Sequence, residues 1–138
     1  MDRIFFDAEN QAAGRLASRA AREALKGKAV IVVNAEKAII TGNPTFVIKR
    51  YYGMVDRGSP YHGPFYPRLP DRMLRRIIRG MLPYSRQRGK QAFRRVMVYN
   101  SVPEEFSKQD FIKGGDISAP KYITLGTLAE RLGAKRTW

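Results

Sequence analysis

Four arginines recur at a spacing that places their guanidinium groups along one face of a short helix. These residues are Arg72, Arg75, Arg76 and Arg79. At about 100° per residue, the apolar side chains of the same segment fall on the opposite face. They are Leu74, Ile77, Ile78 and Met81. Guanidinium is a planar, forked donor that suits phosphate oxygens, so the chemistry indicated is the binding of a polyanion.

A solvent-exposed charged face is the alternative interpretation of these arginines. Such faces usually interleave acids and bases so that the charges support one another. Here Asp71 is the one acidic residue in the helix, and four like charges repel unless an anion neutralises them. The pattern therefore favours contact with a polyanion.

Prolines frame this helix and the segment that leads into it. Pro70 sets φ for the first helical residue, and Pro83 ends the helix because it has no N–H to donate. Residues 57–70 are predicted to form a long, extended loop, with prolines at positions 60, 64, 67 and 70. Its aromatic and histidine side chains could stack on unpaired bases. The alternative is that Phe65 and Tyr66 cover the core beneath the loop.

Positive charge is concentrated in the middle third of the chain. Residues 49–95 hold thirteen Lys and Arg against two Asp, whereas the full chain has a net charge of +14. A second basic loop is predicted at 83–90, followed by a short helix over 91–95. The candidate RNA-binding residues are Lys49, Arg50, Arg57, His62, Tyr66, Arg68, Arg72, Arg75, Arg76, Arg79, Arg86, Arg88, Lys90, Arg94 and Arg95.

The elements that must position this segment indicate an α/β fold. Residues 4–6 and the β-branched run 29–34 are predicted to be buried strands, joined by an alanine-rich helix over 12–25. This order is a βαβ unit. Further strands are predicted at 38–41 and 96–99, and residues 121–124 should be extended. A helix over 45–55 should turn Phe46, Val47, Tyr51 and Met54 inward, and a last helix covers 127–132. At 138 residues with 43% hydrophobic content, the chain is long enough for one domain with a core.

The same sequence lacks the groups that most enzymes of α/β fold need. There is no cysteine and only one histidine, His62, so neither a thiolate site nor a histidine-rich metal site is predicted. Neither a phosphate-binding P-loop nor a dinucleotide fingerprint follows the first strand. No catalytic residue, cofactor, metal ion or small-molecule substrate is therefore predicted. A small nucleotide- or nucleic-acid-processing enzyme remains the alternative function, and a DNA-binding regulator would need a helix-turn-helix pattern that we do not find.

No signal peptide or membrane span is visible, which predicts a cytoplasmic protein.

Several short motifs, in order along the chain, resemble one family: the large-subunit ribosomal protein conventionally numbered thirteen, in its archaeal and eukaryotic form. The motifs are Gly14-Arg15-Leu16-Ala17-Ser18, Val33-Asn34-Ala35-Glu36, Ile40-Thr41-Gly42, Gly63-Pro64-Phe65-Tyr66-Pro67-Arg68, Arg79-Gly80-Met81-Leu82-Pro83, Arg88-Gly89-Lys90 and Ile123-Thr124-Leu125-Gly126. The resemblance implies a three-layer α/β/α fold with a parallel sheet of about four strands. It also implies binding to large-subunit ribosomal RNA, a role in subunit assembly and translation, and neighbouring ribosomal proteins as partners. By position, the loop 63–68, the helix 72–79 and the loop 86–90 would face RNA, whereas residues 107–120 match no part of the pattern.

The prediction from the sequence is thus a structural, non-enzymatic protein of the large ribosomal subunit. It comprises a single RNA-binding domain, residues 1–138, with a basic loop-helix-loop insertion at about 57–95. Replacing Arg75, Arg76 and Arg79 with Gln should flatten the salt dependence of RNA binding by about two units of log–log slope.

Overall fold

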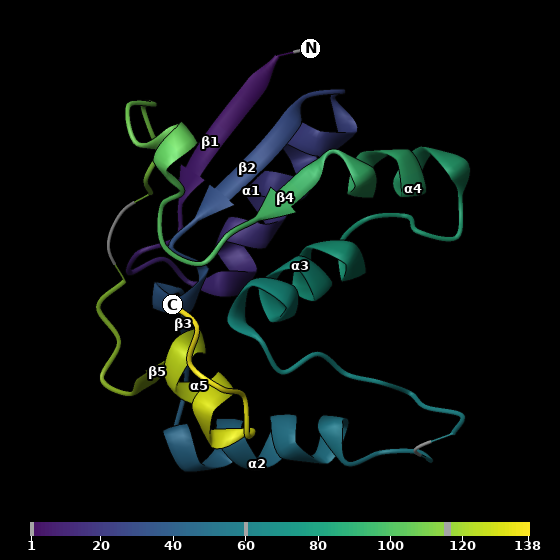
Figure 1. The fold of residues 1–138 in the computed structure, drawn as a ribbon, viewed down its shortest axis with the longest axis vertical. Coiled ribbons are helices and arrows are strands. Elements are labelled where there is room, and N and C mark those ends of the chain that lie inside the picture. The colour runs from purple at the N-terminus through teal and green to yellow at the C-terminus, as the bar shows by residue number, and fades with distance from the viewer. Residues whose placement is uncertain (1, 60, 115–116) are drawn as a thin grey trace.

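The computed structural model of the protein describes residues 2–59, 61–114 and 117–138 (Figure 1). Pro60, one of the four prolines predicted to keep the 57–70 loop extended, lies outside the described residues. So do residues 115–116 of the segment 107–120 that matched no motif. No helix of the described residues is long and apolar enough to cross a membrane.

A parallel sheet of three strands forms the centre of the fold. The strands are β1 (Arg3–Asp7), β2 (Ala29–Val33) and β4 (Val96–Val98), in the order β1-β2-β4. Phe5 pairs with Ile31, and Val30 pairs with Val96. The predicted α/β class and the βαβ unit are confirmed, with α1 (Ala13–Leu25) as the crossover helix.

A further segment lies along the free edge of β1, where a fourth parallel strand would be. Ile112 forms an isolated parallel bridge with Phe6, and its N–H donates to the Phe5 carbonyl at 2.8 Å. The expected number of about four strands is therefore approximate. The segment 107–120, which the sequence left unplaced, supplies this extra pairing.

The remaining strands form a separate antiparallel pair, β3 (Ile39–Thr41) with β5 (Tyr122–Thr124). Both extended segments were predicted. Between β2 and β3 lies a single 3₁₀ turn, η1 (Ala35–Lys37). After β5 the chain enters α5 (Leu125–Arg131), which ends before Gly133 at φ +94°. This helix begins two residues earlier than predicted, because the Thr124 hydroxyl accepts a hydrogen bond from the Thr127 N–H at 3.3 Å and caps it.

The two faces of the parallel sheet are covered differently. Helix α1 packs on one face together with α3 (Pro70–Gly80), where Leu16, Met73, Leu74 and Ile78 are fully buried. Small buried side chains on α1, mainly alanines, allow α3 to approach closely. The other face holds a second cluster of Phe5, Ile31, Val33 and Phe106, which the 3₁₀ turn η2 (Glu104–Phe106) closes. Figure 1 shows η2 and α1 on opposite sides of the sheet.

Helix α3 confirms most of the predicted amphipathic pattern. Leu74 and Ile78 are buried, but Met81 is 44% exposed, because the helix ends at Gly80 and Met81 leaves the apolar face. Met73, which was not predicted, takes a fully buried place.

Two other helices differ from their predictions. In α2 (Pro44–Val55) only Val47 is buried, and Phe46, predicted to point inward, is 66% exposed. The prediction failed because α2 packs on the core along a narrow side only. Helix α4 (Gln87–Arg94) begins four residues before the predicted helix, so half of the predicted 83–90 loop is helical. Within α4, Gly89 lies against the Pro83 carbonyl, where a Cβ would be only 1.9 Å from the oxygen.

Candidate nucleic-acid interface

The structure leaves most of the predicted RNA-binding side chains open to solvent. Four of the fifteen are partly buried, namely Tyr66, Arg75, Arg79 and Arg95. The exposed ones are Lys49, Arg50, Arg57, His62, Arg68, Arg72, Arg76, Arg86, Arg88, Lys90 and Arg94. They belong to α2, the 57–69 segment, α3 and α4 with its N-cap residue, which Figure 1 shows on the side of the molecule away from β1.

Arg75 is used inside the protein. Its Nε donates to the Val96 carbonyl at 3.1 Å and its Nη2 donates to the Phe93 carbonyl at 3.3 Å. Its guanidinium carbon also lies 3.9 Å from the centre of the Phe93 ring. Burial of the guanidinium lowers the pKa of Arg75. Arg75 therefore joins α3 to the end of α4 and the start of β4, and two of its donors are already engaged.

Two neighbouring arginines also lie over aromatic rings. The Arg79 guanidinium carbon is 4.1 Å from the centre of the Tyr84 ring, and that of Arg76 is 5.9 Å from the centre of the Tyr66 ring. Each distance is within the range of a cation–π interaction. Three arginines of the α3 face thus lie over rings from three different segments. Phe93 belongs to α4, Tyr66 to the 57–69 segment, and Tyr84 to the turn between α3 and α4.

These ring contacts hold the guanidiniums without neutralising them. A ring face attracts the cation through its quadrupole but carries no net charge. Arg72, Arg75, Arg76 and Arg79, with Pro67 and Phe93, line a pocket of about 240 Å³. The pocket joins α3 to α4 and has four cationic side chains in its wall, which suits an anionic group.

Tyr66 and Phe65 have opposite roles in the structure. Tyr66 packs against the core, and its ring meets that of Tyr51 at 5.9 Å. Burial raises the pKa of Tyr66 to about 12, so its hydroxyl is protonated at neutral pH. Phe65 is 71% exposed and does not cover the core. The alternative that aromatic side chains cover the core therefore holds for Tyr66 and is wrong for Phe65.

Arg95 also has an internal partner. Its Nη1 donates to the Ala24 carbonyl at 2.9 Å, at the C-terminal end of α1. The same carbonyl accepts from the Gly27 N–H at 3.1 Å, and a cation at this end of a helix interacts favourably with the helix dipole. The other basic side chains of α4, those of Arg88, Lys90 and Arg94, are exposed.

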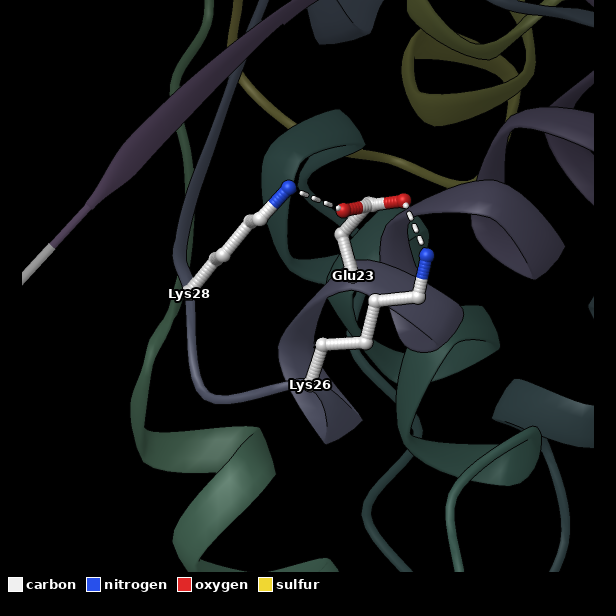
Figure 2. A network of polar contacts seen from close by, with 3 residues as sticks. All are labelled: Glu23, Lys26 and Lys28. Atoms are coloured by element: carbon white, nitrogen blue, oxygen red, sulfur yellow. Dashed lines mark hydrogen bonds and ion pairs between the residues drawn. The ribbon is translucent and has the colours of Figure 1, made fainter.

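Ion pairs lie elsewhere in the molecule. Glu23 contacts Lys26 at 3.4 Å and Lys28 at 3.0 Å, where α1 ends and the chain turns into β2 (Figure 2). In residues 2–59, 61–114 and 117–138, no arginine of the 49–95 segment forms an ion pair with a carboxylate. The positive charge of this segment is thus left without an acidic partner in the described part of the chain.

Sequence reasoning missed two side chains of this surface, Tyr84 and Phe93. Both rings lie under arginines of α3, and they meet edge to face with centres 5.6 Å apart. The available signal was their place within a strongly basic segment. The packing of α4 against α3 decides which arginine lies over each ring. Local sequence patterns do not predict that packing.

Comparisons with known proteins agree on one family. Residues 2–105 match the family described as ribosomal protein L13. The chain is similar to the large ribosomal subunit protein uL13 of Archaeoglobus fulgidus, with 42% identity over 96% of this chain and 88% of that protein. It is also similar to the proteins of the same name from Haloarcula marismortui (43% identity, covering 98% of this chain and 94% of that protein) and Methanococcus maripaludis (45%, covering 96% and 98%).

Proposed function

This chain belongs to the ribosomal protein L13 family, and we propose that it binds large-subunit ribosomal RNA through the exposed arginines of α3, α4 and the 57–69 segment. It is a ribosomal protein of the large subunit, and its relatives are structural ribosomal proteins rather than enzymes. Neighbouring proteins of the subunit and a role in its assembly belong to the same proposal.

The observation that carries the proposal is the unpaired positive charge of residues 49–95. This segment has thirteen Lys and Arg but only two Asp. Among the described residues, the arginines of the segment that have partners contact aromatic rings and backbone carbonyls, and none contacts a carboxylate. Concentrated positive charge of this kind repels itself, and a dense anion such as folded RNA would relieve that repulsion. Arginines on rigid elements would fix the position of the protein through phosphate contacts.

The structure divides the arginines of α3 into two groups. Arg72 and Arg76 are exposed and free to reach phosphates, whereas Arg75 has donors committed to the Val96 and Phe93 carbonyls. We therefore assign phosphate contact to Arg72 and Arg76, with Arg79 held on Tyr84 beside them. Arg75 is assigned the role of keeping α3 and α4 together.

A salt titration with two charge-matched variants tests this proposal. Both Arg72→Gln with Arg76→Gln and Lys26→Gln with Lys28→Gln remove two positive charges, but Lys26 and Lys28 are paired with Glu23. Binding to large-subunit ribosomal RNA is measured for each from low to high salt. The arginine variant should lower the log–log slope by about 1.5 units, at roughly 0.7 to 0.9 per phosphate contact. The lysine variant should leave the slope near that of the wild type.

Equal slopes in the wild type and the arginine variant would overturn the assignment of Arg72 and Arg76. Equal decreases in both variants would mean that net charge alone drives binding. Thermal unfolding of each variant checks the fold, and exposed side chains of this kind should change stability by no more than about 0.5 kcal/mol.

A further inference from the structure

A second pocket, of about 480 Å³, lies between the C-terminal end of α2 and the 57–68 segment. Its lining includes Asp56, Arg57, Ser59, Phe65 and Arg68. It is distinct from the pocket between α3 and α4, and it combines an exposed aromatic ring, two guanidiniums and one carboxylate. These are the groups that would recognise the base and the phosphate of one nucleotide.

Backbone hydrogen bonds fix the wall of this pocket. The Gly63 N–H donates to the Ser59 carbonyl at 2.8 Å, and the Ser59 N–H donates to the Gly63 carbonyl at 3.2 Å. Gly58 has φ +86°, and a Cβ there would lie 1.9 Å from the Gly63 carbonyl oxygen. The chain closes tightly here because position 58 is glycine. The side chains on either side of this turn are therefore presented from a defined backbone.

Phe65 presents an open aromatic surface at this pocket. Its side chain is 71% exposed, although it lies close enough to Gly63 that a Cβ there would be 3.1 Å from two ring carbons. An exposed phenylalanine that contributes little to the core has a ring free to stack. Unpaired bases stack on such rings in RNA-binding proteins.

Asp56 is the one carboxylate among the lining residues, and it has no evident structural purpose. It is the C-cap residue of α2, where a negative charge is unfavourable to the helix dipole. Arg57 and Arg68 line the same pocket, yet no ion pair or side-chain hydrogen bond joins either of them to Asp56 in the described part of the chain. Among the described residues, nothing occupies the acceptor oxygens of this carboxylate.

A free carboxylate beside two arginines distinguishes between bases. An ionised carboxylate only accepts hydrogen bonds. Guanine carries two adjacent donors, N1–H and N2–H₂, on its Watson–Crick edge, which match the two carboxylate oxygens. Adenine and cytosine place an acceptor nitrogen beside their amino group, and uracil places its single N–H between two carbonyls. Guanine is thus the base that fits best.

We propose that this pocket receives one unpaired guanine nucleotide of the bound RNA, with the base on Phe65, its Watson–Crick edge on Asp56 and its phosphates on Arg57 and Arg68. The inference rests on the proposed function, because the nucleotide belongs to the RNA that the basic surface binds. It adds a base-specific contact to a surface that otherwise recognises phosphate positions.

Chemical footprinting with a glyoxal reagent tests the inference, since such reagents modify the N1 and N2 atoms of unpaired guanine. Large-subunit ribosomal RNA is saturated with the protein of residues 1–138, either the wild type, Asp56→Asn, Phe65→Leu or the Arg72→Gln and Arg76→Gln variant. The wild type should protect at least one unpaired guanine. Asp56→Asn should lose that protection while the rest of the footprint stays. Phe65→Leu should weaken it, so that about tenfold more protein is needed.

The outcomes separate this inference from the proposed function. If Asp56→Asn protects every guanine as well as the wild type does, the pocket assignment is wrong while RNA binding stands. If instead the arginine variant keeps the wild-type salt slope, the proposed function fails on its own measurement. Titration with guanosine monophosphate alone is the third arm. Tight binding of this free nucleotide, with no guanine protected in the RNA, would overturn the inference in favour of a small ligand.

Discussion

Two groups of cations on this protein have different partners. At the corner between α1 and β2, Lys26 and Lys28 contact the carboxylate of Glu23 at 3.4 and 3.0 Å. On α3, Arg75, Arg76 and Arg79 lie over the rings of Phe93, Tyr66 and Tyr84. The first group is partly neutralised within the protein, because two ammonium groups share one carboxylate. The second is held in position but keeps its charge.

This difference separates cations that share a carboxylate within the protein from cations whose charge no described carboxylate offsets. A carboxylate competes with phosphate for a guanidinium, whereas a ring face leaves the edge of the guanidinium free to donate. The arrangement has a cost, because like charges along α3 repel while no anion is bound. Under the proposed function, bound RNA would relieve this repulsion.

The largest effect on the packing of the α3 arginines against their rings should come from Gly89→Ala. This change should push α4 away from the turn at Pro83 and Tyr84. A Cβ at position 89 would be 1.9 Å from the Pro83 carbonyl oxygen, so backbone must move. We expect a loss of about 3 kcal/mol in the free energy of unfolding. Gly53→Ala is the matched control, because a Cβ at that position of α2 would have nothing within 4 Å and alanine favours a helix by about 0.5 to 1 kcal/mol. Urea unfolding of both variants measures the contrast, and similar losses at the two sites would contradict it.

A smaller effect is expected from Arg75→Gln. This change removes two hydrogen bonds to carbonyls and a contact with Phe93, and should cost about 2 kcal/mol after allowance for partial solvent exposure. Arg72→Gln on the same helix is the control, and its stability should stay within about 0.5 kcal/mol of the wild type. Denaturant unfolding distinguishes them. Equal stabilities of the two variants would show that Arg75 is no more structural than Arg72.

The smallest effect should come from Glu23→Gln, and it should depend on pH. The hydrogen bond from Lys28 holds the pKa of Glu23 below its usual range. Because the pKa in the folded state is lowered, the ion pair contributes stability above the usual range for glutamate, and this contribution is lost as the pH falls through the folded-state pKa. Thermal unfolding should show a small difference from the wild type at pH 7 and none in strong acid. A difference that persists in acid would mean that the carboxylate acts through shape rather than charge.

Local patterns in the sequence predicted the parts of the fold that depend on nearby residues. The β-branched run before Asn34 and the alanines of 12–25 identify a strand and a helix by themselves. The period of Arg72, Arg76, Leu74 and Ile78 likewise determines which side chains of α3 face the core, because 3.6 residues make one turn. The ordered motifs were enough to identify the family, and the arginine bias indicated a polyanionic partner.

Tertiary structure alone decided which of these side chains are free. In the sequence, Arg75 and Arg95 look like the other arginines of the basic segment. In the structure, the Arg75 guanidinium donates to the Val96 carbonyl and the Arg95 guanidinium donates to the Ala24 carbonyl. Phe65 and Asp56 became a candidate site only because the turn at Gly58 brings them to one pocket. The physical reason is that helical periodicity fixes a direction around one axis, whereas a hydrogen-bond partner depends on how distant segments pack.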